Sequence, residues 1–443
     1  MANNKTVYQT SRILAKNVTM SNDTWATGLN NNDLIIGPSG AGKTRGYVKP
    51  NILQANGSMV IADTKGNLYE ELSPFLEKKG YRTLLIDFKE MKSTCGYNPM
   101  DYLPYDRNRK CYSEEGIRRL CTVLAPSSPA DKDPFWNNAS RQYLECLMAY
   151  VMECLPPRER SLEYVIRLFG EMQTKVFDNL MKELMSIDPE CYASKIYRGI
   201  MGNMEAEKMH ASILGILSEH LNGLNTQAVL ELYNHPNKLA FETLGQEKTA
   251  LFLSISDTDR SSDKLVSLFY TQALQALCSY ADQKCEDNRL PMPVRFILDD
   301  FATNCVIESF DNIISVIRSR EIYVSIIIQS ISQLNGVYGP EKAKTIINNC
   351  DNCLYLGGLD VGTADYFSIK TNMNMHAILN MPLDNVLLFT RGRDFRQVEK
   401  YDLCSHPDYE EMQRLQKAAR SRKILEAVEK TDTESVPDLR QRA

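Results

Sequence analysis

Residues 34–44 carry the clearest chemical signal in the sequence, in the order Leu-Ile-Ile-Gly-Pro-Ser-Gly-Ala-Gly-Lys-Thr. The run meets in full the pattern G-x-x-x-x-G-K-[ST] of a phosphate-binding loop. Glycines at positions 37, 40 and 42 keep side chains out of a concavity of backbone N–H groups, and they tolerate positive φ. The helix expected to follow directs its N-terminal partial positive charge at the same anion. The run therefore predicts a nucleotide site.

Eight consecutive residues are predicted to contact the nucleotide: Gly37, Pro38, Ser39, Gly40, Ala41, Gly42, Lys43 and Thr44. We expect Lys43 to reach the β- and γ-phosphates and the Thr44 hydroxyl to coordinate Mg²⁺. A glycine turn without a ligand, between a strand and a helix, is the competing interpretation. The apolar run before the loop and the Lys-Thr pair that opens the next segment favour the nucleotide.

The run Phe-Ile-Leu-Asp-Asp at 296–300 is the best candidate for the second ATPase motif. A buried strand that ends in a carboxylate places the acid at the carboxyl edge of a sheet, beside the phosphate loop. Asp299 is expected to hold Mg²⁺ there. Asp300, one methylene shorter than the more usual Glu, is expected to position and deprotonate the attacking water. The alternative is that the two acids simply begin a loop.

Further candidates lie at the ends of other predicted strands. Gln329 follows an apolar run and could sense the γ-phosphate or its water. Asp63 and Lys65 end the strand after the phosphate loop, where ligands of open α/β sheets gather, or they merely form a turn. Arg318 and Arg320 precede the Gln329 strand. In a ring ATPase an arginine there could reach the γ-phosphate of a neighbouring subunit; the alternative is a solvated pair at a helix end.

Short apolar runs that alternate with helical segments must position these residues. Strand-length runs occur at 34–36, 58–62, 83–87, 250–255, 294–298, 323–328, 354–356 and 386–389. A helical pattern at 67–79 contains Pro74, which is expected to break it. Near-continuous apolar strands separated by helices indicate a parallel sheet covered on both faces, an α/β fold.

The pattern changes between residues 113 and 234, where helical periodicity dominates. Apolar residues recur at i, i+3 and i+4 in the segments 138–154, 162–184 and 205–221. The sequence therefore predicts an all-helical unit inserted into the α/β chain. From residue 410 we expect a charged helix, and beyond residue 431 a polar, disordered tail.

The composition is that of a soluble globular protein, with 43% hydrophobic and 24% charged residues. A net charge of −5 argues against a surface coated with charge for nucleic acid, although a local basic channel is compatible with it. The 12 cysteines are expected to be reduced and mostly buried, because no signal peptide is apparent and Cys350-x-x-Cys353 has no second pair to complete a zinc site. No run reaches the ~18–20 apolar residues of a membrane span.

Taken together, these residues resemble the type IV coupling proteins of conjugation, the TraG/TraD-like DNA-transfer ATPases. The resemblance covers residues 30–400 in the expected order. It rests on LIIGPSGAGKT at 34–44, MVIADTKGNLYEEL at 59–72, DPFWNNASRQYLECLMAYV at 133–151, ALFLSISDTD at 250–259, RFILDDFA at 295–302 and IRSREIYVSIIIQSISQLNGVYG at 317–339.

The resemblance implies a RecA-like P-loop domain, an inserted all-α domain that recognises substrates, and a homo-hexameric ring. Its boundaries would be a polar lead at 1–30, the RecA-like domain at 31–102 and 246–405, the all-α domain at 103–245, and a charged helix with a tail at 406–443. Hydrolysis of ATP with Mg²⁺ would drive relaxase-bound single-stranded DNA, or protein substrates, into a type IV secretion channel.

Members of that family usually carry transmembrane helices before the phosphate loop, whereas about thirty polar residues stand there in this sequence. We therefore expect a cytoplasmic protein, or one peripheral to the inner face of the cell membrane, with any anchor supplied by a separate protein. Two functions remain open: a motor that moves DNA, and a nucleotide-dependent docking adaptor that hands substrates on without moving DNA. A small-molecule P-loop kinase fits poorly, because the long helical insert has no counterpart there.

Overall fold

The computed structural model describes residues 11–90, 92–126, 134–256, 258–304 and 306–434. Its centre is a nine-stranded sheet in the order β13-β12-β11-β3-β10-β9-β4-β8-β5, in which every pairing from β11 to β5 is parallel. The strands are β3 (Asp33–Ile36), β4 (Ser58–Asp63), β5 (Arg82–Asp87), β8 (Thr249–Ser254), β9 (Val294–Leu298), β10 (Ile322–Ile328), β11 (Asn352–Tyr355), β12 (Asn385–Thr390) and β13 (Arg396–Glu399). Every strand predicted from an apolar run is present, and β12 and β13 add an antiparallel edge.

Helices cover both faces of the sheet, as the near-continuous apolar strands require. Successive side chains of a strand point to opposite faces. Leu34 and Ile36 accordingly belong to one buried cluster and Ile35 to the other. The Ile35 face is covered by α2 (Lys49–Leu53) and α3 (Leu68–Lys78). The Leu34 face is covered by α11 (Asp263–Lys284), α13 (Phe310–Val316), α14 (Ile331–Tyr338), α15 (Pro340–Asn348) and α16 (Val361–Thr371).

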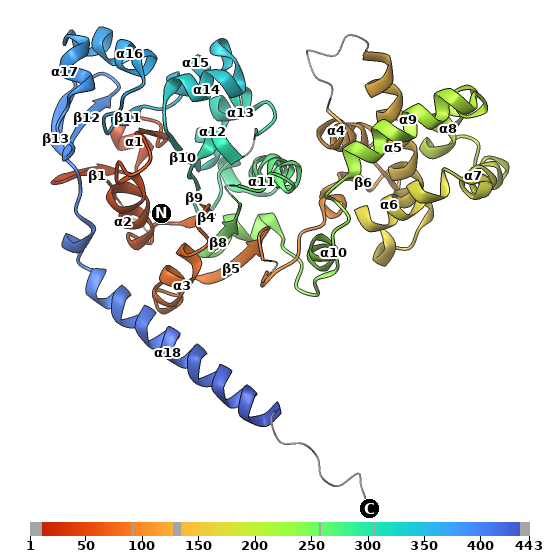
Figure 1. Cartoon of the computed structure of the whole chain (residues 1–443), viewed down its shortest axis with the longest axis horizontal. Coiled ribbons are helices and arrows are strands. Elements are labelled where there is room, and N and C mark those ends of the chain that lie inside the picture. The colour runs from red at the N-terminus through yellow and green to blue at the C-terminus, as the bar shows by residue number, and fades with distance from the viewer. Residues whose placement is uncertain (1–10, 91, 127–133, 257, 305, 435–443) are drawn as a thin grey trace, which may run out of the picture.

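The predicted all-helical insert stands to one side of the sheet (Figure 1). It contains α4 (Glu114–Leu124), α5 (Pro134–Cys154), α6 (Leu162–Glu171), α7 (Lys175–Ile187), α8 (Tyr192–Glu205), α9 (Glu207–Leu221) and α10 (Gln227–Asn234), with a small hairpin of β6 (Tyr105–Asp106) and β7 (Cys111–Tyr112). Helix α5 packs against α4, α6, α8 and α9 and forms the centre of the unit. The chain leaves the sheet after β5 and returns along its neighbour β8, so the insert departs from the carboxyl edge of the sheet.

Two helix predictions were wrong in detail. Pro74 does not break α3, which runs from Leu68 to Lys78, because Leu72, Phe75 and Leu76 are fully buried and hold the helix on the sheet. The segment 162–184 is two helices instead of one, because Thr174 accepts a hydrogen bond from the Val176 amide and caps the start of α7. Tertiary burial and capping outweigh the local pattern at these sites.

The two ends of the chain also carry structure. Within the predicted polar lead, β1 (Ser11–Ala15) and β2 (Val18–Ser21) form an antiparallel hairpin, followed by α1 (Thr24–Thr27). The predicted charged helix is α18 (Tyr409–Glu434), which contacts α3 near its start and then leads away from the sheet (Figure 1). The first ten residues of the lead and residues 435–443 of the predicted tail lie outside the described residues.

Candidate nucleotide site

The phosphate loop continues directly from the most deeply buried part of the sheet. Strand β3 lies between β10 and β11, and its last three residues are fully buried. The Gly37 amide donates to the Ile328 carbonyl at 3.1 Å, and the Leu356 amide donates to the Ile36 carbonyl at 2.8 Å. These bonds carry the sheet ladder up to the first residue of the loop. The loop therefore starts from a fixed position.

Glycine is required at several loop positions. Gly40 and Gly42 have φ of 78° and 87°, a region that favours glycine. A Cβ on Gly37 would lie 3.0 Å from the Cβ atoms of both Ala41 and Leu356, closer than side-chain carbons normally approach. Pro38, Ser39 and Gly40 are exposed at the rim of the loop. The loop has the open, side-chain-free shape that a phosphate chain needs.

Lys43 lies folded over the loop that it is predicted to serve. Its ammonium group donates to the Gly37 carbonyl at 2.6 Å and to the Pro38 carbonyl at 3.0 Å, and the residue is buried. Burial lowers the pKa of Lys43, the carboxylates of Asp300 and Asp299 act in the opposite direction, and the charge of Lys65 lowers it further. Both acids of the second motif are therefore close enough to the ammonium group to affect its pKa.

Asp299 follows β9 and meets the helix after the phosphate loop. The Thr44 hydroxyl donates to Asp299 Oδ2 at 3.3 Å. Burial, and then the neighbouring charge of Asp300, raise the pKa of Asp299 to about 6, while Lys43 and the hydrogen bond from Thr44 act to lower it. A hydroxyl beside a crowded, buried carboxylate is a favourable pair of oxygens for a hard divalent cation. The residues present therefore fit Mg²⁺ at the position predicted for it.

Asp300 adopts the left-handed backbone conformation, with φ of 51°. Its amide donates to Asp299 Oδ1 at 3.1 Å, and the short helix α12 (Phe301–Asn304) begins directly after it. Left-handed residues other than glycine are uncommon and cluster at functional sites. The turn gives Asp300 and Asp299 separate environments, since Asp299 is buried and Asp300 is half-buried.

Gln329 lies where the sequence predicts it, at the carboxyl end of β10 and beside the phosphate loop. It is exposed and, together with Pro38, Tyr355 and Gly358, lines a cleft of about 260 Å³. The backbone amide of Gln329 donates to the side-chain oxygen of Gln333 at 3.2 Å. The site thus includes the exposed side-chain amide of Gln329, which directly follows the strand between the phosphate-loop strand and the Asp299 strand.

Gln333 is a site-supporting residue that the sequence did not indicate. Its side-chain amide donates to the Thr303 hydroxyl at 2.6 Å, which joins α14 to α12, the helix after Asp300. A glutamine four residues after a strand-ending glutamine is a weak signal. The supporting role of Gln333 becomes visible only in the structure, where α12 packs against β10 and α14 and so brings Thr303 within reach of Gln333.

Arg318 and Arg320 lie far from the phosphate loop of their own chain. Both precede β10 and therefore stand at the amino edge of the sheet, whereas the loop is at the carboxyl edge. A seven-residue strand spans about 20 Å. Arg320 donates two hydrogen bonds of 2.8 Å to Asp282, while Arg318 is exposed. The structure excludes a contact with the nucleotide of the same chain, and a contact with that of a neighbouring subunit stays a prediction.

Asp63 and Lys65 have different environments, although only one residue separates them. The buried Asp63 carboxylate accepts hydrogen bonds from the amides of Gly66, at 2.9 Å, and Leu68, at 2.7 Å, and so caps the start of α3. Burial raises the pKa of Asp63 against these bonds, which lower it. Lys65 is exposed and electrostatically coupled to Lys43. Asp63 is therefore a structural residue, and Lys65 belongs to the surroundings of the nucleotide site.

The substitution Asp63→Ala is expected to lower the free energy of unfolding by about 1–3 kcal/mol, because the amides of Gly66 and Leu68 lose their acceptor and the Leu68 amide is buried. Nucleotide affinity should change little, since Asp63 does not face the loop. Urea unfolding and titration with a fluorescent nucleotide measure the two quantities. Ser113→Ala, which removes the cap of α4 in the helical insert, is the matched control. A large loss of affinity in Asp63→Ala alone would contradict the structural role.

Within the described part of the chain, no helix combines the length and the apolar character needed to cross a membrane.

Comparison with known proteins identifies the family to which this chain is similar. A family model described as "Type IV secretory system Conjugative DNA transfer" matches residues 1–374. Protein VirD4 of Rhizobium radiobacter is 26% identical over 346 residues, and VirD4 of Agrobacterium fabrum is 25% identical over 346 residues. Both alignments cover 76% of this chain but 47% and 48% of the relatives, so the chain spans about half the length of the curated relatives that it matches.

Solved structures show the same fold at low sequence identity. The plasmid coupling protein TrwB in complex with ADP and Mg²⁺ has a TM-score of 0.64 and 18% identity, and covers 88% of this chain and 89% of its own. The TrwB complex with the GTP analogue GDPNP has the same TM-score and 17% identity, over 88% and 90% of the two chains. VirB4 of Thermoanaerobacter pseudethanolicus has a TM-score of 0.56 and 13% identity, over 89% and 96%.

The predicted RecA-like P-loop fold with a helical insert is thereby confirmed. The family model spans the phosphate loop, the second acidic motif and the helical insert together. From its sequence and its fold, the chain belongs to the conjugative DNA transfer family of type IV secretory systems.

Proposed function

We propose that this chain binds ATP with Mg²⁺ and hydrolyses it. The observation that carries the proposal is the convergence of Lys43, Thr44, Asp299 and Asp300 at one edge of the sheet, although the two pairs lie more than 250 residues apart in sequence. Main-chain amides of the loop would hold the phosphates, and Lys43 would leave its two carbonyl partners to neutralise them. The TrwB complexes with ADP and Mg²⁺ and with an ATP analogue support this assignment.

Each polar residue of the site has a distinct task in this proposal. Thr44 and Asp299 would hold Mg²⁺, which supplies neutralisation of the charge that develops on the phosphates. Asp300 would orient the attacking water and accept its proton, and Gln329 would hydrogen-bond the γ-phosphate or that water. Because Arg318 and Arg320 are at the other edge, the positive charge that stabilises the transition state would come from a neighbouring subunit in a ring of six copies.

We further propose that hydrolysis serves the transfer of DNA. Membership of the conjugative DNA transfer family supports single-stranded DNA with its relaxase, or a protein substrate, as the cargo, and a type IV secretion channel as the destination. The helical insert leaves from the same edge of the sheet as the phosphate loop. If the insert recognises substrates, nucleotide-dependent movements at that edge would reach it directly. The chain would act at the cytoplasmic side of the channel.

Single-stranded DNA is expected to raise the ATPase rate of the purified protein several-fold, and the effect should fall steeply with salt, because contacts with the phosphate backbone release counterions. Steady-state ATPase assays with and without DNA, at increasing salt, measure this. A double-stranded DNA of equal length is the control for unspecific charge. Tight nucleotide binding without any DNA stimulation would instead support the docking adaptor, which the net charge of −5 favours.

A further inference from the structure

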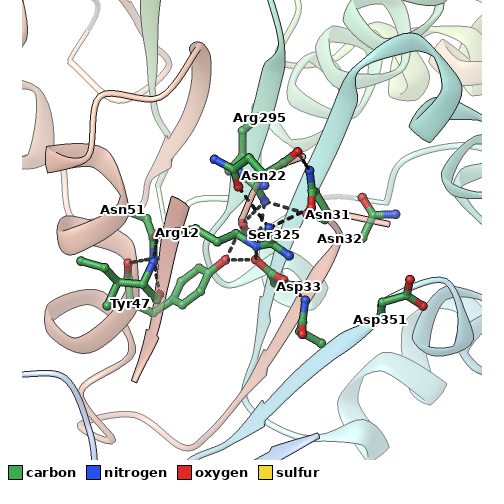
Figure 2. Close-up of polar contacts among 12 residues, drawn as sticks. Arg12, Asn22, Asn31, Asn32, Asp33, Tyr47, Asn51, Arg295, Ser325 and Asp351 are labelled. Carbon is green, nitrogen blue, oxygen red and sulfur yellow. Dashed lines mark hydrogen bonds and ion pairs between the residues drawn. The ribbon is translucent and has the colours of Figure 1, made fainter. Parts of the chain in front are cut away.

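A buried polar cluster lies at the amino end of β3, at the opposite end of the strand from the phosphate loop (Figure 2). At its centre is Asp33, which is fully buried. Its Oδ2 atom accepts hydrogen bonds from Arg12 Nε and from the Tyr47 hydroxyl, both at 2.6 Å. Its Oδ1 atom accepts one from the Asn352 side chain at 3.0 Å. One carboxylate therefore joins the N-terminal hairpin, the helix after the loop and strand β11.

Tyr47 links this cluster to the nucleotide site. It lies three residues after Thr44, within the π-helical turn Thr44–Val48 that follows the phosphate loop. Besides its bond to Asp33, its hydroxyl lies 2.9 Å from Ser325 Oγ on β10. Burial raises the pKa of Tyr47, so the hydroxyl stays neutral and can donate. The helix that presents Lys43 and Thr44 is thus bonded to β3, which leads into the loop, and to the neighbouring strand β10.

Asn51 joins the same helix to the N-terminal hairpin. Its side-chain oxygen accepts from the Ile13 amide, and its side-chain nitrogen donates to the Ile13 carbonyl, each at 2.8 Å. The same nitrogen donates to the Tyr47 carbonyl at 2.8 Å. The side-chain amide thereby pairs with strand β1 as another strand would. The hairpin is an integral part of the support of this helix.

The charges in the cluster allow few other arrangements. Arg12 and Arg295 both approach Asp33, with Arg295 Nη1 at 3.7 Å from Asp33 Oδ2. Arg295 also donates to the Asn31 carbonyl at 2.9 Å and to Ser325 Oγ at 3.1 Å, and burial lowers its pKa. Cations this close to one carboxylate depend on the hydrogen bonds that they make. Arg12 Nε and Nη1 are paired, whereas Arg12 Nη2 is buried without a hydrogen-bond partner in the described part of the chain, so most but not all of the donors hold the cluster in place.

The helix after the phosphate loop needs such support. It consists of the π-helical turn Thr44–Val48 and the five residues of α2, Lys49–Leu53. π turns are rare and recur at functional sites, and a helix this short has little stability of its own. Its position relative to the loop must come from contacts outside the helix. Tyr47 and Asn51 supply them.

We propose that the cluster around Asp33 is a positioning device of the nucleotide site, and that Tyr47 is its key positioning residue. Through the Tyr47 hydroxyl, the N-terminal hairpin and strands β3 and β10 set the place of Lys43 and Thr44 relative to the loop amides. The proposal rests on the proposed binding of ATP and adds residues that never touch the nucleotide. The hairpin at residues 11–21 is accordingly a functional element of the ATPase.

The variant Tyr47→Phe tests this, because it removes one hydroxyl and keeps the ring and the Arg12–Asp33 pair. The dissociation constants for fluorescent ATP and ADP are expected to rise about tenfold, because Lys43 and Thr44 would be displaced by a fraction of an ångström from their places relative to the loop amides. The rate at saturating ATP should change less than KM. Amide hydrogen exchange of residues 37–48 should become faster.

The matched control is Tyr97→Phe. Tyr97 is equally buried, and its hydroxyl donates to the Gln272 side chain at 2.7 Å, away from the phosphate loop. It should lose a similar amount of stability in urea but bind nucleotide as the wild type does. Ser325→Ala, which removes the second partner of Tyr47, should shift affinity in the same direction as Tyr47→Phe.

Equal nucleotide affinity and equal exchange in wild type and Tyr47→Phe would overturn the inference. The inference would also be overturned if Tyr97→Phe weakened nucleotide binding as strongly as Tyr47→Phe, since the loss of affinity would then reflect a general loss of stability. A wild-type chain that binds no nucleotide would overturn the proposed function itself, and the inference with it. The three outcomes are distinguished by measuring the wild type and both variants side by side.

Discussion

Replacing Lys43 with alanine is expected to lower ATP turnover by at least about 10²-fold, the usual effect of removing one preorganised group that stabilises transition-state charge. In the structure the Lys43 ammonium group holds the carbonyls of Gly37 and Pro38 and faces Asp299 and Asp300. On binding, the phosphates would replace those carbonyls as its partners. Alanine leaves the loop amides in place, so weakened nucleotide binding would remain measurable.

The fold should survive this substitution. Burial lowers the pKa of Lys43, which means that its charged form is held at an energetic cost, and removing it relieves that cost while two hydrogen bonds are lost. We expect the free energy of unfolding to change by no more than about 1–2 kcal/mol. Steady-state ATPase assays and urea unfolding measure the two effects.

Lys264→Ala is the matched control for Lys43→Ala. Burial also lowers the pKa of Lys264, and its ammonium group donates to the His220 carbonyl at 2.9 Å, away from the phosphate loop. The control should keep full ATPase activity. Lys43→Ala with undiminished turnover would contradict the assignment of the site, as would equal losses in the two variants.

The variant Asp299→Asn is expected to abolish Mg²⁺-dependent nucleotide binding and yet stabilise the nucleotide-free protein. The Asp299 carboxyl has a folded pKa of about 6, raised by burial and by Asp300 above its ordinary value of 3.8. Such a group is disfavoured as an anion in the folded state, and about two pKa units correspond to roughly 2–3 kcal/mol. Asparagine cannot ionise and has nearly the same shape, so it removes that penalty.

Because the pKa of Asp299 is raised in the folded state, the stability of the protein should depend on pH in a specific direction. Between about pH 4 and pH 6 the folded protein binds more protons at Asp299 than the unfolded chain, so rising pH lowers stability in that window. Above about pH 6 the penalty is complete. Unfolding of wild type and Asp299→Asn in urea at pH 4.5 and pH 8 should therefore show the largest stabilisation of the variant at pH 8. Mg²⁺ binding by the wild type should weaken below pH 6, because the metal requires the carboxylate.

Asp300→Asn is the control that separates charge from metal binding. It should slow hydrolysis but retain binding of nucleotide with Mg²⁺, because Asp300 is assigned to the water and Asp299 to the metal. Since Asp300 contributes to the raised pKa of Asp299, the variant should also shift the pH dependence of Mg²⁺ binding to lower pH. An Asp299→Asn protein that bound nucleotide and Mg²⁺ normally would refute the proposed metal site.

The phosphate loop could be predicted from sequence because its chemistry is local. Glycine positions, the lysine and the hydroxyl all lie within eight residues, and the backbone shape they require is encoded in the same segment. The parallel sheet was equally accessible, since strands buried on both faces leave continuous apolar runs. Asp299 could be found because an acid that directly follows a buried strand lies at the carboxyl edge of a parallel sheet, the edge that also carries the phosphate loop. Each of these features depends on a short stretch of chain.

The role of Asp63 depended on the tertiary structure. Its position at a strand end resembles that of Asp299, but the amides of Gly66 and Leu68 reach it first and make it a helix cap. Arg318 and Arg320 lie near Gln329 in sequence but at the opposite end of the same strand. Sequence distance does not show to which edge of a sheet a residue belongs.

By itself the sequence determined the fold class and the helical insert and predicted the residues that would bind the nucleotide, because these follow from patterns of neighbouring residues. Only the tertiary structure decided what supports that site: Arg12, Tyr47 and Asn352 meet Asp33 from three separate segments. A buried polar contact between distant segments has no periodicity, and its energy exists only once burial removes water from both partners. That is why the sequence predicted only a polar lead where the structure has a hairpin bonded to the helix after Lys43, the lysine proposed to bind phosphate.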